Sequence, residues 1–191
     1  RRMSVIDSTE PVPGKDLFLT LDSKLQKVAY DTLESELRKA VLGKLTGGGK
    51  NHVTPNELFA SMIEVNHISA AKMLRATSGM QLEMLQRLQQ TMPDFDAEAE
   101  DAVSNAQDFL LNGLANGSIG HRELILMMIE QEHLPVTEEE LAGITSGTIT
   151  PYRLILTKLQ NGEMSPADTG LDPCTGSVFV TQVGSGEVLA S

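Results

Sequence analysis

The chain has 191 residues, of which 40% are apolar, 16 are glycine and only 4% are aromatic, and it contains no tryptophan. This length and composition predict one domain or two small ones, and exclude both wholesale disorder and a disulfide-stapled miniprotein. The shortage of aromatic side chains argues against a stacking surface for single-stranded nucleic acid.

The net charge of −11 is concentrated in the middle of the chain. Residues 51–168 contain 17 acidic and 6 basic side chains, whereas the two flanks together contain nine of each. This difference in charge predicts a domain boundary near each end of residues 51–168. Because phosphate backbones would repel so acidic a surface, we expect no nucleic-acid partner and favour a protein or cationic partner.

Cysteine content and hydropathy exclude several further classes of protein. Cys174 is the only cysteine, which excludes an intramolecular disulfide and a cysteine-based metal cluster. No run of apolar residues approaches the length of a membrane span, and the first residues lack the apolar core of a signal peptide. We therefore expect no membrane anchor within these residues.

The N-terminal part of the chain predicts a strand followed by a helix. Residues 1–15 are polar and predict an extended lead-in, and residues 16–21 alternate apolar and polar side chains as a short strand does. From there the spacing changes to every fourth residue and predicts a helix with Asp22 as its N-cap and Gly43 as its stop. The apolar face of that helix comprises Leu25, Ala29, Leu33, Leu37 and Val41.

The middle of the chain carries helix start signals at close spacing. Thr54 and Thr137 each open a capping box, and a proline follows Thr54, Thr150 and Ser165 at the first helical position. The spacing is irregular, so no solenoid repeat is predicted. The predicted helices span 55–65, 68–76, 79–91, 96–115, 119–132, 138–145 and 151–161. The predicted core comprises Leu58, Met62, Leu85, Leu88, Val103, Phe109, Leu110, Leu124, Met128, Leu154 and Ile155.

The last residues return to β structure. Residues 177–183 and 187–190 predict two strands, joined by a turn at the glycine-containing residues 184–186. The expected fold class is α+β and predominantly α-helical, with a small antiparallel sheet and a first helix interrupted by an all-helical insertion. We expect the two ends to meet, with residues 16–21 burying one face against the hairpin and the helix packing over both.

Ser69 and Lys72 match the Ser-x-x-Lys pattern, which places both side chains on one helical face where the lysine can take the serine proton. The same chemistry needs a Ser-x-Asn element and a Lys-Thr-Gly strand, and neither occurs in the sequence. A structural helix at the surface is the favoured interpretation of this pair.

Three further patterns resemble ligand sites but lack required residues. Lys44 to Lys50 resembles a phosphate-binding loop without the glycine that should open it. Asp94 to Glu98 resembles the start of a calcium loop, but Ala99 replaces the glycine of its sharp turn and Asn105 its bidentate glutamate. No cofactor and no metal is predicted. The histidines, which lack metal-binding spacing, are His52, His67, His121 and His133. The methionines expected to fill the core, with a partner groove as the alternative, are Met62, Met73, Met80, Met84, Met92, Met127 and Met128.

Two segments resemble class B penicillin-binding proteins, the transpeptidases that cross-link peptidoglycan. Residues 13–29 (PGKDLFLTLDSKLQKVA) are similar to the strand and helix that open the transpeptidase module, and residues 176–190 (GSVFVTQVGSGEVLA) to its first hairpin. Gln182 stands where the family usually has aspartate, and about 130 residues separate helix and hairpin instead of a short link. Helical insertions at this place resemble those of clostridia-like bacteria, which also carry a stretch like residues 171–176.

The resemblance implies that the two ends of the chain and its middle have different roles. Residues 16–50 and 169–191 would form part of the base of the transpeptidase module, and residues 51–168 a helical insertion with a structural or partner-binding role toward proteins of the cell-wall or division machinery. The parent would be a membrane-anchored D,D-transpeptidase on the outer face of the bacterial membrane, with its active-site serine beyond Ser191. We therefore expect no catalytic residue in this chain. The alternatives are a free-standing acidic helical interaction module and a complete enzyme.

Overall fold

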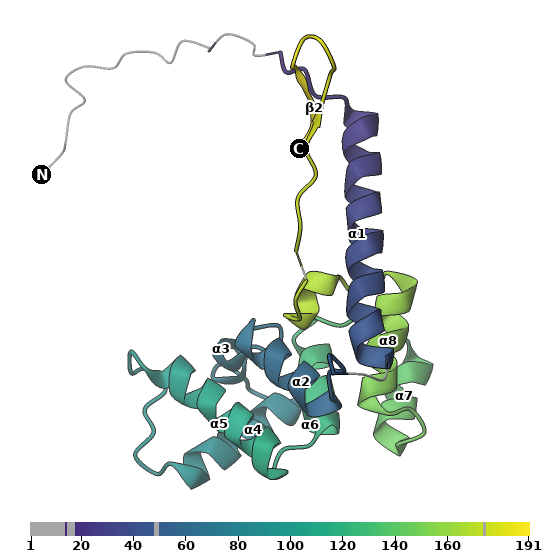
Figure 1. The fold of residues 1–191 in the computed structure, drawn as a ribbon. Helices are drawn as coiled ribbons and strands as arrows, with labels where there is room; N and C mark the ends of the chain where they lie inside the picture. Colours follow the sequence, from purple (N-terminus) through teal and green to yellow (C-terminus); the bar gives the residue numbers. More distant parts are fainter. Residues whose placement is uncertain (1–13, 15–17, 48–49, 174) are drawn as a thin grey trace, which may run out of the picture.

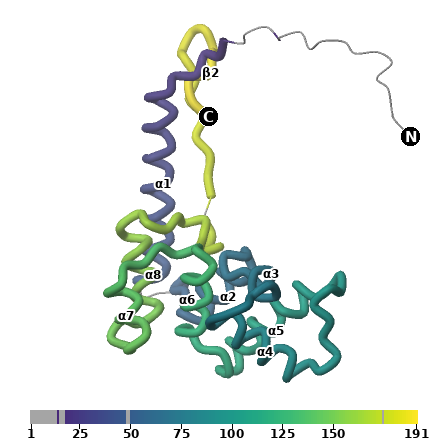
Figure 2. Tube along the Cα trace, turned by 180° about the vertical axis from the view of Figure 1, so that it is seen from behind, coloured from purple at the N-terminus to yellow at the C-terminus, as the bar shows by residue number. Residues whose placement is uncertain are grey.

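The computed structural model describes residue 14 and residues 18–47, 50–173 and 175–191. The long helix α1 (Ser23–Thr46) stands as a stalk, with a hairpin beside its N-terminal half and the other helices gathered at its C-terminal end (Figure 1). The view from behind shows the same division (Figure 2). The predominantly helical α+β fold is therefore confirmed. The helical domain contains α2 (Pro55–Glu64), α3 (Ala70–Met73), α4 (Gly79–Thr91), α5 (Ala102–Asn116), α6 (His121–Glu130), α7 (Glu138–Ser146), α8 (Pro151–Asn161) and the 3-10 helix η1 (Pro166–Thr169).

Helix α1 begins where the sequence predicts and ends one turn later. The carboxylate of Asp22 accepts the backbone N–H groups of Lys24 and Leu25, which makes it the N-cap. The predicted stop at Gly43 is wrong, because the helix continues to Thr46. The added turn carries Leu45, which is 1% exposed, so burial of that side chain stabilises a turn that a glycine alone would weaken.

The core of the helical domain extends into α1. Val41 and Leu45 belong to the same apolar cluster as Leu58 of α2 and Ile155 of α8, and the Tyr152 hydroxyl donates to the Leu45 carbonyl oxygen at 2.7 Å. The predicted core included only residues between 58 and 155, whereas the observed core also takes in these two side chains of α1. A single contiguous core joins the second half of the stalk to the helices around it.

Most predicted core residues are buried, with a few exceptions on α4 and α5. Five of the seven methionines, from Met62 to Met128, are fully buried, whereas Met92 is 37% exposed. Phe109 is half-buried, and Val103 is 44% exposed because α5 buries the stripe that starts at Ala102. The helix predicted over 96–115 begins only at Ala102. Asp101 makes no side-chain cap there, and the acidic residues 94–101 form turns before it.

Five helix ends share one backbone design. In each, a residue with positive φ ends the helix, and an apolar residue two positions later lies against the domain. In four of them that apolar residue donates its backbone N–H to the carbonyl six residues earlier, one residue further back than in the Schellman motif. The residues with positive φ are Asn66, Gly117, Glu132, Gly147 and Gly162, and the apolar residues are Ile68, Ile119, Leu134, Ile149 and Met164.

The two ends of the chain meet at the hairpin, as predicted. Strands β1 (Val180–Thr181) and β2 (Val188–Ala190) pair antiparallel with an irregular register. The Asp22 N–H donates to the Leu189 carbonyl at 2.9 Å, and the Thr20 hydroxyl to the Val188 carbonyl at 2.6 Å.

The strand predicted over residues 16–21 is not formed in its described part. Residues 18–21 have no ladder partner, and residues 15–17 lie outside the described residues. Phe18 is 91% and Leu19 68% exposed, so neither face of the segment is buried as expected. A single backbone hydrogen bond at Asp22 does not make a ladder.

Gly113 tests the packing of the helix end that follows α5, and Gly43, a helical glycine with open space around it, is its control. A Cβ atom at Gly43 would meet no heavy atom within 4 Å, whereas one at Gly113 would overlap the side chain of Ile119. Gly43→Ala should raise the free energy of unfolding by about 0.5–1 kcal/mol through better helix propensity. Gly113→Ala should lower it by about 1–3 kcal/mol through overpacking. Urea denaturation measures both, and a Gly113→Ala variant as stable as the parent chain would contradict the described turn.

Candidate functional site

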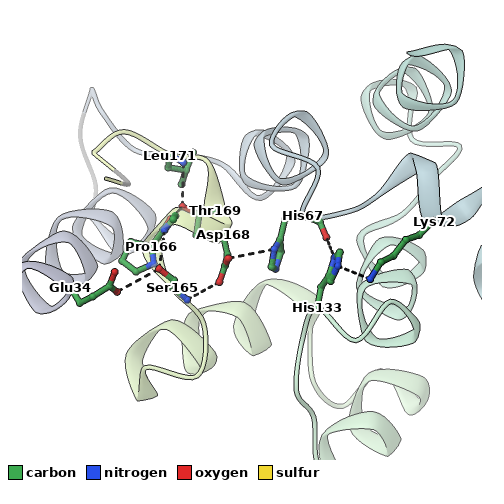
Figure 3. Close-up of polar contacts among 10 residues, drawn as sticks. Glu34, His67, Lys72, His133, Ser165, Pro166, Asp168, Thr169 and Leu171 are labelled. Carbon is green, nitrogen blue, oxygen red and sulfur yellow. Dashed lines mark hydrogen bonds and ion pairs between the residues drawn. The ribbon is translucent and has the colours of Figure 1, made fainter. Parts of the chain in front are cut away.

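A cluster of titratable side chains lies where the α2–α3 turn, the end of α6 and η1 meet (Figure 3). We call His67, Lys72, His133 and Asp168 the histidine cluster. His67 follows the left-handed residue that ends α2, and His133 follows the corresponding residue after α6. The repeated helix end thus places two histidines from distant parts of the chain side by side.

The contacts of His133 define which ring nitrogen donates. Its Nδ1 atom lies 2.7 Å from the carbonyl oxygen of His67, and its Nε2 atom lies 2.8 Å from the Lys72 ammonium. Because a carbonyl only accepts and an ammonium only donates, Nδ1 is the donor in the first contact and Nε2 the acceptor in the second. The Lys72 ammonium also donates to the Gln131 carbonyl at 2.7 Å.

His67 joins this arrangement to η1. Its ring stacks on His133 with centroids 5.4 Å apart, and its Nδ1 atom lies 3.6 Å from a carboxylate oxygen of Asp168. Burial lowers the pKa of His67 and the nearby His133 lowers it further, while the Asp168 carboxylate acts in the opposite direction. The Nε2 atom is buried without a hydrogen-bond partner among the described residues.

Asp168 links the histidine cluster to the stalk. Its second carboxylate oxygen accepts the backbone N–H of Ser165 at 2.8 Å and caps η1. The Ser165 hydroxyl in turn lies 3.5 Å from the Glu34 carboxylate on α1 (Figure 3). The cluster therefore stabilises the junction between the helical domain and the segment that returns to the hairpin.

Ser69 and Lys72 have separate structural roles. Ser69 is 3% exposed, so it is buried and not at the surface as expected, and its hydroxyl caps α3 by accepting the Lys72 N–H at 3.3 Å. The Gln131 side chain accepts from the Ser69 N–H and donates to its carbonyl. The Lys72 ammonium is hydrogen-bonded to Gln131 and His133, and no described hydrogen bond joins it to the Ser69 hydroxyl. This geometry agrees with a structural interpretation of the Ser-x-x-Lys pattern.

The other sequence patterns do not converge on a ligand site. Asp96 uses its carboxylate to accept the Glu98 N–H, so the calcium-like stretch forms a turn instead. The Lys44 ammonium donates to the Asp172 carbonyl. Cys174 and residues 48–49 of the glycine-rich loop lie outside the described residues. No group of three or more potential metal ligands occurs in the described part of the chain.

One buried ionic group was missed at the sequence level. Lys158 of α8 is 3% exposed at its side chain, and its ammonium lies 2.8 Å from Glu140 and 2.6 Å from Glu163. Burial lowers the pKa of Lys158, but the hydrogen bonds to the two carboxylates outweigh it and raise the pKa overall. The available signal was its position on the apolar stripe of α8, where it lies between Ile155 and Leu159.

The chain matches no protein-family model, no curated protein and no solved structure. In the part of the chain that the structure describes, no helix is both long enough and apolar enough to cross a membrane. Any assignment of function therefore rests on the residues of this chain and on their geometry.

We predict that the free energy of unfolding falls in mild acid, because two partly buried histidines resist protonation in the folded chain. Burial lowers the pKa of His67 and of His121 below the ordinary value of 6.5, so the unfolded chain takes up protons first as the pH falls. The free energy of unfolding should decline from about pH 7.5 to about pH 5, above the range in which the carboxylates titrate.

Urea denaturation at several pH values measures this decline. His67→Gln should make the decline smaller, with the remainder due to His121. His52→Gln, which removes an exposed histidine outside the histidine cluster, is the matched control. An unchanged pH dependence in His67→Gln would show that the cluster does not control it.

Proposed function

We propose that the chain is a non-catalytic part of a class B penicillin-binding protein, in which the helical domain is a structural or partner-binding module. The observation that carries this proposal is the contact between its two end segments. Residues 13–29 and 176–190 carry the resemblance to the transpeptidase module, and their described parts lie side by side although the helical domain separates them in sequence (Figure 1).

Side-chain contacts support the same pairing. The Gln26 side chain donates to the Ser191 carbonyl and accepts its N–H at 3.0 Å, so α1 is hydrogen-bonded to the residue that follows β2. Leu33 packs so closely on Gly176 that a Cβ atom there would overlap it. Such contacts are what the opening helix and first hairpin of one module require.

Several large apolar side chains are exposed on α1, on the segment before it and on the hairpin. The most accessible are Phe18 at 91% and Val183 at 99%, and Val28, Tyr30 and Phe179 are each at least 60% exposed. In the proposed parent, the remainder of the transpeptidase module would cover part of these side chains.

The proposed parent acts through a serine outside this chain. It would be anchored in the membrane and face the outside of the cell, where the serine is acylated by a peptidoglycan stem peptide or by a β-lactam. The helical domain would contact proteins of the cell-wall or division machinery. Division, elongation and sporulation are all roles open to such a parent.

A free-standing acidic helical module is the second candidate. The extensive core of the helical domain and its excess of carboxylates favour a domain that works by contact alone. The two candidates differ in the coding sequence that follows Ser191. A series of Ser-x-x-Lys, Ser-x-Asn and Lys-Thr-Gly motifs there supports the transpeptidase parent, and a stop directly after Ser191 contradicts it.

A fluorescent penicillin provides the chemical test of this chain. We expect no covalent label on the isolated chain, because acylation needs a serine that is activated in a cleft beside an oxyanion hole. Ser69 is buried, and its hydroxyl is occupied as the cap of α3. Labelling that is specific and disappears in Ser69→Ala would overturn the non-catalytic assignment.

A further inference from the structure

We propose that a groove between α4 and α5 binds a basic polypeptide segment. This inference rests on the proposed contact role of the helical domain and names the chemistry of its partner. It does not depend on the resemblance to transpeptidases.

The groove has a volume of about 360 Å³ and lies between the end of α4 and one face of α5. Met92 and Phe109 contribute its apolar surface. Asn105, Asp108 and Asn112 follow one another along α5 at helical spacing and contribute the polar wall. None of these three polar side chains is hydrogen-bonded to another described residue, so their amide and carboxylate groups remain available to a ligand.

The surroundings of the groove are strongly negative. The loop over residues 93–101 connects the two helices that form it, and it carries five carboxylates between Asp94 and Asp101. None of them, nor that of Asp108, takes part in an ion pair among the described residues. No lysine or arginine occurs between Arg87 and Arg122, and the Arg87 guanidinium is already paired with Glu123 at 2.6 Å.

A lysine- or arginine-containing segment fits this combination best. The methylene stem of such a side chain can lie on Met92 and Phe109 while its charged end reaches Asp108 and the loop. The asparagine amides can pair with the backbone of an extended segment. A nucleic acid would be repelled by the same carboxylates, and the described residues form no cluster that could hold a metal ion.

The test uses the full chain and fluorescein-labelled hexalysine, measured by fluorescence anisotropy. In parallel, NMR follows the side-chain amide signals of Asn105 and Asn112, which report on the groove itself. The double variant Asp94→Asn/Asp108→Asn removes one exposed charge that lines the groove, at Asp108, and one from the loop that follows Met92, at Asp94. The matched control Glu138→Gln/Glu139→Gln removes two exposed charges from the start of α7, which does not line the groove.

We expect hexalysine to shift both amide signals and the groove variant to weaken binding about fivefold, as the loss of two exposed ion pairs implies. The control should weaken binding less than about twofold, and Met92→Ser should weaken it without any change in charge. Equal weakening by the two double variants would show diffuse attraction to an acidic protein and overturn the proposal. Absence of binding, or binding without amide shifts, would overturn it as well. None of these outcomes bears on the motifs expected after Ser191.

Discussion

The structure depends on one helix that has different neighbours at its two ends. The C-terminal half of α1 places Val41 and Leu45 in the core of the helical domain, whereas its N-terminal end holds β2 through Asp22 and Gln26. With 24 residues it is about 36 Å long, so the hairpin and the helical domain are kept apart by a rigid rod. The return segment after η1 runs back beside it to reach the hairpin (Figure 2).

Within the helical domain, short helices are stabilised by their ends more than by their length. Helices of 4 to 15 residues are marginal alone, and here the left-handed residue and the apolar anchor after it define where most of them stop. The same turn brings His67, after α2, next to His133, after α6. The contact of His67 with Asp168 then links these two helix ends to η1. Because Ser165 of η1 contacts Glu34, the stability of this junction and the position of the return segment are coupled.

Local signals explain what the sequence could predict. The predicted bounds of α4 and α8 match the observed ones, because the signals that end these helices, Pro93 and Gly162, closely follow them in the sequence. The stop of α1 depended instead on the burial of Leu45 by helices far away in sequence. The ion pairs of Lys158 and the contact of His67 with Asp168 join segments that no local pattern relates. The spacing of the histidines in the sequence could not indicate that His67 and His133 stack.

The beginning of α1 and strand β2 are neighbours in space, although most of the chain separates them in sequence. The most direct measurement is an NMR experiment on the full chain that follows the Asp22 amide proton. Its hydrogen bond to the Leu189 carbonyl predicts slow exchange with solvent and nuclear Overhauser effects to the α protons of β2. Exchange at the rate of an unfolded chain, with no such effect to residues 188–190, would contradict the pairing of the two ends and the account built on it.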